Sequence, residues 1–114
     1  MIIIAFSNKT SKFIPNLLCR KLKHVAPIVP HGDRLIMYQF VSYGRVEKIV
    51  LRMRDIQILK AHGWNFIYID GIRLPYEFNP YTAHTCVDLS KRAIGIKRWH
   101  IQTPLGLYKE LTSN

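Results

Sequence analysis

The middle of this chain consists of short apolar segments separated by residues that reverse the chain direction. The turn candidates are residues 30–33, Gly44 and residues 70–71. Glycine, proline and aspartate favour tight turns because of their backbone preferences. Between these turns, β-branched and aromatic residues dominate, as is typical of strands. The pattern predicts consecutive strands joined by hairpins, which restricts this part of the chain to an antiparallel sheet.

The remaining segments complete an α+β prediction. Strands are predicted over residues 2–6, 24–29, 34–42, 45–52 and 65–69, and Pro27 favours an edge position or a bulge for the second of them. Helical patterns begin at residue 11 and cover residues 55–62, 86–95 and 103–112. We therefore expect an antiparallel sheet of four to five strands, packed with an N-terminal helix, the helix that bears Cys86 and a C-terminal helix.

The size and composition fit one globular domain spanning residues 1–114. Hydrophobic residues make up 48% of the chain and charged residues 21%, which favours a folded core over disorder. Without eighteen consecutive apolar residues, no transmembrane helix is expected. The apolar start over residues 1–6 is too short for a signal peptide and has no basic segment before it. A cytoplasmic location is the expectation.

The charge is strongly unbalanced, with a formal net charge of +10. Such a charge favours polyanions such as nucleic acid, cell-wall polymer or a membrane surface, but does not choose between them. The cations gather around the strand 45–52 and the helix 86–95, at Arg45, Lys48, Arg52, Arg54, Lys91, Arg92, Lys97 and Arg98. No helix-turn-helix, RRM or zinc-finger signature accompanies them. A solvated basic face is the simpler interpretation.

The two cysteines, Cys19 and Cys86, are too few for a disulfide framework, and free thiols in a reducing compartment fit better. Cys19 lies in the first helical pattern and is interpreted as a buried apolar residue. The histidines and cysteines have no metal-binding spacing, so neither a metal nor another cofactor is expected.

Cys86 is the candidate for chemistry because it lies in the first turn of a predicted helix. The helix dipole and the unpaired N–H groups there stabilise a thiolate. A nucleophile also needs a base, and His24 at the start of a strand is held more rigidly than His84, which lies in a loop two residues before Cys86. The other histidines are His31 and His62 in predicted turns and His100 near the end. The alternative for Cys86 is a buried helical cysteine without chemistry.

Two short motifs also resemble a known family. Residues 23–29 (Lys-His-Val-Ala-Pro-Ile-Val) are followed about sixty residues later by residues 85–95 (Thr-Cys-Val-Asp-Leu-Ser-Lys-Arg-Ala-Ile-Gly). This order is similar to the circularly permuted branch of the NlpC-type papain-like cysteine hydrolases, which includes YiiX-like proteins and relatives of lecithin retinol acyltransferase. The tail over residues 99–108 resembles small phage and bacterial members. For a phage member, the host cytoplasm or the virion would be the location.

The resemblance implies a permuted papain-like fold with Cys86 as nucleophile and His24 as general base. Such enzymes attack an amide or ester carbonyl and form a thioacyl intermediate, here on a peptide, cell-wall or acylated substrate. A third group usually orients the imidazole. A hairpin around residues 31–32 would place His24 roughly opposite Gln39, which makes Gln39 the first choice; Tyr38 and no third group remain open.

The sequence is therefore compatible with two classes of function. The first is a cysteine-dependent hydrolase or acyltransferase whose scissile bond, whether peptide, ester or isopeptide, is undetermined. A neutral glutamine orients a histidine less strongly than a carboxylate does, so the site could also be degenerate. The second class is a catalytically weak or inactive basic protein that uses the same fold to bind nucleic acid or another protein.

Overall fold

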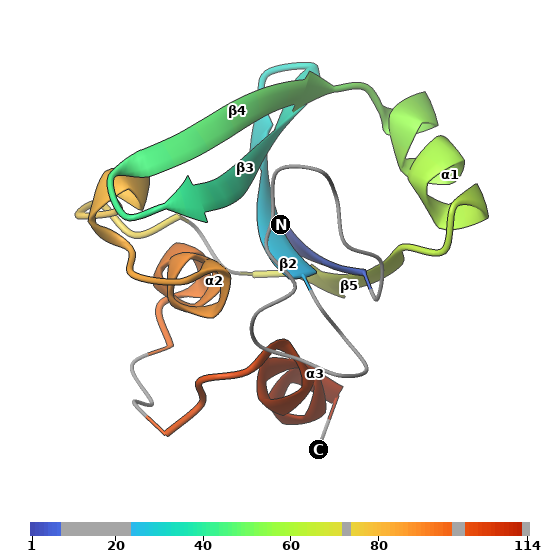
Figure 1. Cartoon of the computed structure of the whole chain (residues 1–114). Coiled ribbons are helices and arrows are strands. Elements are labelled where there is room, and N and C mark those ends of the chain that lie inside the picture. Colours follow the sequence, from blue (N-terminus) through green and yellow to red (C-terminus); the bar gives the residue numbers. More distant parts are fainter. Residues whose placement is uncertain (8–23, 72–73, 97–99, 113–114) are drawn as a thin grey trace.

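A computed structural model describes residues 1–7, 24–71, 74–96 and 100–112, and it has an α+β fold (Figure 1). The strands are β1 (Ile2–Ser7), β2 (His24–His31), β3 (Arg34–Ser42), β4 (Arg45–Leu51) and β5 (Asn65–Ile69). The helices are α1 (Met53–Ala61), the 3-10 turn η1 (Pro80–Thr82), α2 (Cys86–Ile94) and α3 (Pro104–Thr112). The predicted antiparallel sheet is confirmed. The helix predicted from residue 11, with Cys19 in it, lies outside the described residues.

The five strands form one antiparallel sheet in the order β4–β3–β2–β1–β5. Two of its hairpin turns use glycines with positive φ, Gly32 at 62° and Gly44 at 79°. L-residues rarely adopt these angles, so the sequence places its turns where only glycine fits without strain.

β2 is the central strand, which corrects the edge position suggested by Pro27. β1 pairs along β2 from Ile3↔Ile28 to Ser7↔His24, and β3 pairs with it from Ile28↔Met37 to His31↔Arg34. Pro27 lies just before the part of β2 that pairs with β3. Its missing amide hydrogen therefore does not interrupt that ladder.

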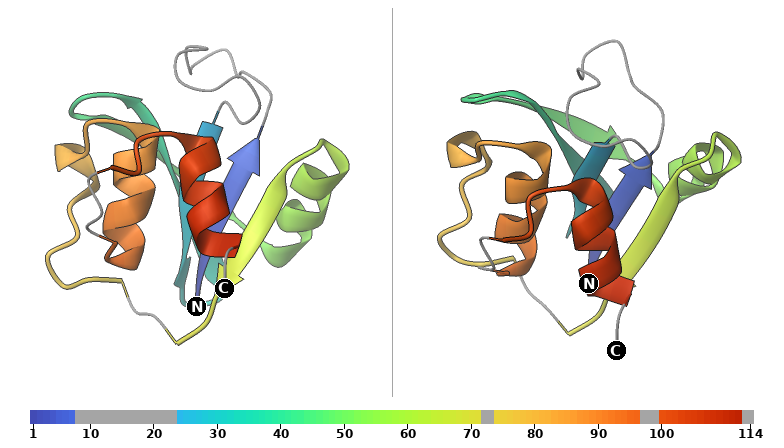
Figure 2. Two further views of the ribbon diagram at one scale, coloured as in Figure 1. Left: turned by 90° about the horizontal axis from the view of Figure 1, so that it is seen from below. Right: turned by 60° about the horizontal axis from the view of Figure 1, so that its bottom comes forward.

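The sheet has two covered faces because its side chains alternate. We call one the α2 face, where Phe6 and Val25 pack with Val87 of α2 and Leu107 of α3. The other is the α1 face, where Ile3, Ala26 and Met37 pack with Ile56 of α1. Figure 2 shows α2 and α3 side by side over the first of these faces, with α1 away from them beside β5.

Within the described residues, no helix is long and apolar enough to cross a membrane.

Candidate functional site

Cys86 is the first residue of α2, as its sequence context predicts. The Thr85 hydroxyl accepts a hydrogen bond from the Asp88 amide at 2.9 Å, and the Asp88 carboxylate accepts one from the His84 amide at 2.9 Å. These two bonds satisfy amides at the helix start and fix where α2 begins. The Cys86 residue is only 6% exposed and belongs to the core of the α2 face.

His24 is the first residue of β2 and is also buried, at 2% exposure. Its ring meets the Trp64 ring edge-on, with centroids 5.6 Å apart. In the described part of the chain, neither ring nitrogen has a hydrogen-bond partner. Burial disfavours the charged imidazolium and lowers the pKa of His24 from 6.5 to about 4. His24 is therefore a neutral imidazole at pH 7.

The structure does not bring His24 and Cys86 together. Neighbouring residues of a strand point to opposite faces, and Val25 packs on the α2 face with the core that contains Cys86. His24 must then point to the α1 face, where Trp64 also packs. Because the imidazole has no hydrogen-bond partner among the described residues, it forms no dyad with the thiol here.

The predicted third residue does not orient the imidazole either. Counting on from Ile28↔Met37, Gln39 stands level with Ala26 rather than with His24. It pairs with Glu47 on β4, and its amide donates a 3.4 Å hydrogen bond to the Met37 sulfur. The hairpin lies where the sequence predicts it, but its register puts Gln39 two residues from the position opposite His24.

The other candidate for that role, Tyr38, also lies away from His24. It pairs with Lys48 of β4, and its ring meets Phe78 edge-on at 5.6 Å. Tyr38 neighbours Gln39 on β3, so the two side chains point to opposite faces of the sheet. His24 lies on the α1 face, which leaves Tyr38 on the far side of the sheet from it.

The remaining histidines do not provide an obvious base. His84 is exposed, and its ring stacks on Tyr43 with centroids 4.8 Å apart. His31 and His62 are exposed in or beside turns, as predicted, and His100 is exposed as well. Among the described residues, no three histidine, cysteine, aspartate or glutamate side chains are grouped to hold a metal ion.

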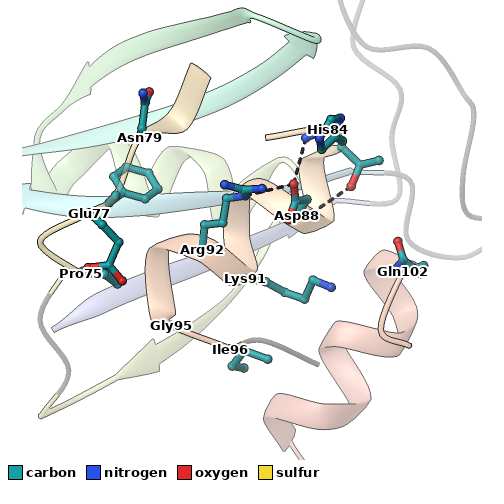
Figure 3. Close-up of a pocket in the computed structure, with 12 residues that line it drawn as sticks. Pro75, Glu77, Asn79, His84, Asp88, Lys91, Arg92, Gly95, Ile96 and Gln102 are labelled. Carbon is teal, nitrogen blue, oxygen red and sulfur yellow. Dashed lines mark hydrogen bonds and ion pairs between the residues drawn. The ribbon is translucent and has the colours of Figure 1, made fainter. Parts of the chain in front are cut away.

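A cavity of about 550 Å³ lies on the outer side of α2, between this helix and the loop around residues 75–79 (Figure 3). Arg92 spans part of its wall, donating to Asp88 at 3.1 Å and to Thr82 at 3.0 Å. Lys91 is buried beside it and donates to the Ile101 carbonyl at 2.7 Å. Cys86 does not line this cavity in the described structure. The cavity therefore gives no substrate access to the sulfur.

The predicted basic surface divides into two parts. Around β4 and α1, the cations are exposed as expected, at Arg45, Lys48, Arg52, Arg54 and Lys60. Around α2, Lys91 is buried and Arg92 is paired with Asp88, while Lys97 and Arg98 lie outside the described residues. The exposed charge thus follows β4 and α1.

One group of side chains cannot be predicted from the sequence because it joins distant segments of the chain. The Lys48 ammonium lies 6.0 Å from the centre of the Tyr38 ring and 5.8 Å from that of Tyr81. His84, three residues after Tyr81, stacks on Tyr43 of the β3–β4 turn. We call Tyr38, Tyr43, Lys48, Tyr81 and His84 the cation–aromatic face. In the sequence, this face is indicated only by the presence of both tyrosines and basic residues. That presence does not predict which of these side chains contact one another.

Comparison with known proteins adds no assignment: no protein-family model, curated protein or solved structure matches this chain. The resemblance to permuted papain-like hydrolases therefore remains a hypothesis based on two short motifs.

Proposed function

We propose that this chain is a basic binding protein for nucleic acid, rather than an enzyme built on a Cys86–His24 pair. The observation that supports this proposal most directly is the row of exposed cations along β4 and α1. Arg45, Lys48, Arg52, Arg54 and Lys60 are all exposed within sixteen residues of sequence.

The acidic residues in the same stretch do not cancel this charge. They are Glu47 and Asp55. Five cations against two carboxylates leave three net positive charges in this stretch, and Asp55 also caps α1 by accepting a 2.8 Å hydrogen bond from the Arg52 amide. The surface keeps a positive excess that attracts phosphates over about a Debye length.

Binding by such a surface is driven largely by the release of counterions from the phosphate backbone. The affinity should therefore fall steeply with salt, with a slope of about 0.7 per neutralised phosphate for a single strand. Fluorescence anisotropy of a labelled oligonucleotide, measured across a salt series, tests this expectation.

A double variant that removes two positive charges, Arg52→Gln with Arg54→Gln, should reduce that salt slope by about 1.4 if both contact phosphates. The control for position is Lys109→Gln, which removes one exposed cation from α3, away from β4 and α1, and should leave the slope unchanged. If the oligonucleotide does not bind at low salt, the nucleic-acid proposal is wrong; if it binds but the double variant keeps the full slope, the phosphates do not contact Arg52 and Arg54.

Cysteine-dependent acyl transfer is the second candidate, and one observation favours it. Cys86 lies at the first position of α2, where the helix dipole favours a thiolate and would also favour an oxyanion. In this reaction the thiolate attacks the carbonyl carbon and the leaving group departs. Water then hydrolyses the thioester and regenerates the thiol. As placed on the α1 face, His24 cannot take the thiol proton.

An activated ester such as p-nitrophenyl acetate tests this second candidate. Turnover that Cys86→Ser removes and Cys19→Ser leaves intact would support a catalytic Cys86. Equal turnover in both variants and in the parent chain would eliminate it, because the reaction would then not depend on this sulfur.

A further inference from the structure

The cation–aromatic face joins two parts of the chain that are far apart in sequence. Tyr38, Tyr43 and Lys48 come from the β3–β4 hairpin, Tyr81 from η1, and His84 from the loop just before α2. Figure 1 shows the β3–β4 turn beside the chain that leads into α2. Because these contacts are tertiary, folding holds the rings in fixed positions before any ligand arrives.

Two of the tyrosine rings on this face remain open to solvent. Tyr43 is 64% exposed, and Tyr81 is 44% exposed. His84 stacks on the Tyr43 ring with an interplanar angle of 30°, so it supports one ring face and leaves the other to solvent. Exposed aromatic rings with one supported face are suited to stacking against a planar ligand.

The charge on this face suits a ligand that carries phosphates. The Lys48 ammonium lies close to both the Tyr38 and the Tyr81 ring. The nearby acid Asp88 is neutralised by Arg92 at 3.1 Å. A planar base and a phosphate could thus be bound within one short stretch of surface.

We propose that the cation–aromatic face binds single-stranded nucleic acid, with bases stacked on Tyr43 and Tyr81 and a backbone phosphate on Lys48. This inference rests on the proposed nucleic-acid function and names its site and its preferred ligand. A duplex keeps its bases paired and stacked inside, so it would use the cations without the rings. The face therefore predicts a preference for single strands.

The test compares a labelled oligothymidine with a duplex of the same length by fluorescence anisotropy. Tyr43→Ala and Tyr81→Ala should each weaken binding of the single strand by about fivefold or more, with much less effect on the duplex. Tyr43→Phe and Tyr81→Phe keep the stacking rings and should bind like the parent chain. This rescue separates the loss of a ring from damage to the fold.

A second tyrosine–lysine pair provides the matched control. Lys60 lies 5.7 Å from the centre of the Tyr68 ring, and Tyr68 is 42% exposed on β5. Tyr68→Ala removes a ring of similar exposure and surroundings, yet it should leave single-strand affinity unchanged. Lys48→Ala and Lys60→Ala remove equal charge, but only Lys48→Ala should lower the preference for the single strand.

The outcomes separate this inference from the proposed function. If single strand and duplex bind equally and Tyr43→Ala and Tyr81→Ala match Tyr68→Ala, the stacking site is wrong, while general nucleic-acid binding stands. If neither oligonucleotide binds at low salt, both proposals fail. Tight binding of heparin with no binding of oligothymidine would also overturn the stacking site, because heparin has no bases.

Discussion

His24 is unusual because a buried polar side chain normally has a hydrogen-bond partner. Its two ring nitrogens have none in the described part of the chain, and its contact is the edge of Trp64. The neutral imidazole can remain there, but the charged form cannot be accommodated without a large cost. This residue should therefore make the stability of the fold depend on pH.

We expect the free energy of unfolding to fall as the pH drops from 6.5 towards 4. Above 6.5, His24 is neutral in both the folded and the unfolded chain. Below it, the unfolded chain binds the proton, whereas the folded chain does so only near its pKa of about 4. The loss attributable to His24 should reach about 3 kcal/mol at the low end of this range.

Urea unfolding at several pH values measures this loss, and His24→Leu is the control because leucine does not titrate. The difference in unfolding free energy between the parent and His24→Leu should change across this pH window. An identical pH profile for both proteins would show that His24 is not held neutral by burial.

The reactivity of the Cys86 sulfur tests whether the chain is an enzyme. Its low exposure means that a reagent can reach the sulfur only after a local opening of the fold. We expect iodoacetamide to label native Cys86 roughly tenfold or more slowly than in urea, as read by peptide mass spectrometry. Native labelling as fast as in urea would indicate an accessible, stabilised thiolate and would favour the hydrolase.

The sequence identifies the chemical character of these residues better than their mutual geometry. It predicts Cys86 at a helix start and His24 at a strand start, and both positions are confirmed. The sequence does not predict which face of β2 is covered by α2. That choice is made by the packing of Val25 and Val87, and it sends the imidazole to the other side of the sheet.

Among the secondary-structure elements, α2 has clear local signals at both ends. Thr85 caps its start, and Gly95 ends it in the left-handed conformation, with φ at 77°. These residue types make the helix bounds readable from sequence. The same holds for the hairpin turns at Gly32 and Gly44.

The order of the strands is not readable in that way. β5 pairs with β1 across more than fifty residues of sequence, and β2 becomes the central strand despite Pro27. Such pairings depend on which apolar faces pack together and not on local backbone preferences. Local signals therefore predict the elements, and tertiary packing decides their neighbours.

The cap of α2 gives a prediction at this scale. Thr85→Ala removes the acceptor for the Asp88 amide and should lower the free energy of unfolding by about 1 kcal/mol. Thr85→Ser keeps a hydroxyl and should lose much less. Chemical denaturation measures both variants, and equal losses would mean that the Thr85 methyl group, not the cap, stabilises the helix.

For the molecule as a whole, the imbalance of charge is the dominant electrostatic feature. The sequence has 17 lysine and arginine residues against 7 aspartate and glutamate residues. In the described residues there are two ion pairs, Arg34–Asp33 and Arg92–Asp88, and each joins partly exposed partners. Such pairs contribute little, so with an excess of ten positive charges repulsion outweighs attraction in the folded state.

This imbalance predicts that salt stabilises the fold while it weakens nucleic-acid binding. Raising the sodium chloride concentration from low to physiological values screens repulsion between exposed cations. The free energy of unfolding should rise by about 1 kcal/mol, or about 4 °C in Tm. Thermal unfolding followed by circular dichroism measures the shift, and charge-reduced Arg52→Gln with Arg54→Gln should show a smaller one. A Tm that falls with added salt would mean that ion pairs, and not repulsion, dominate the charge balance.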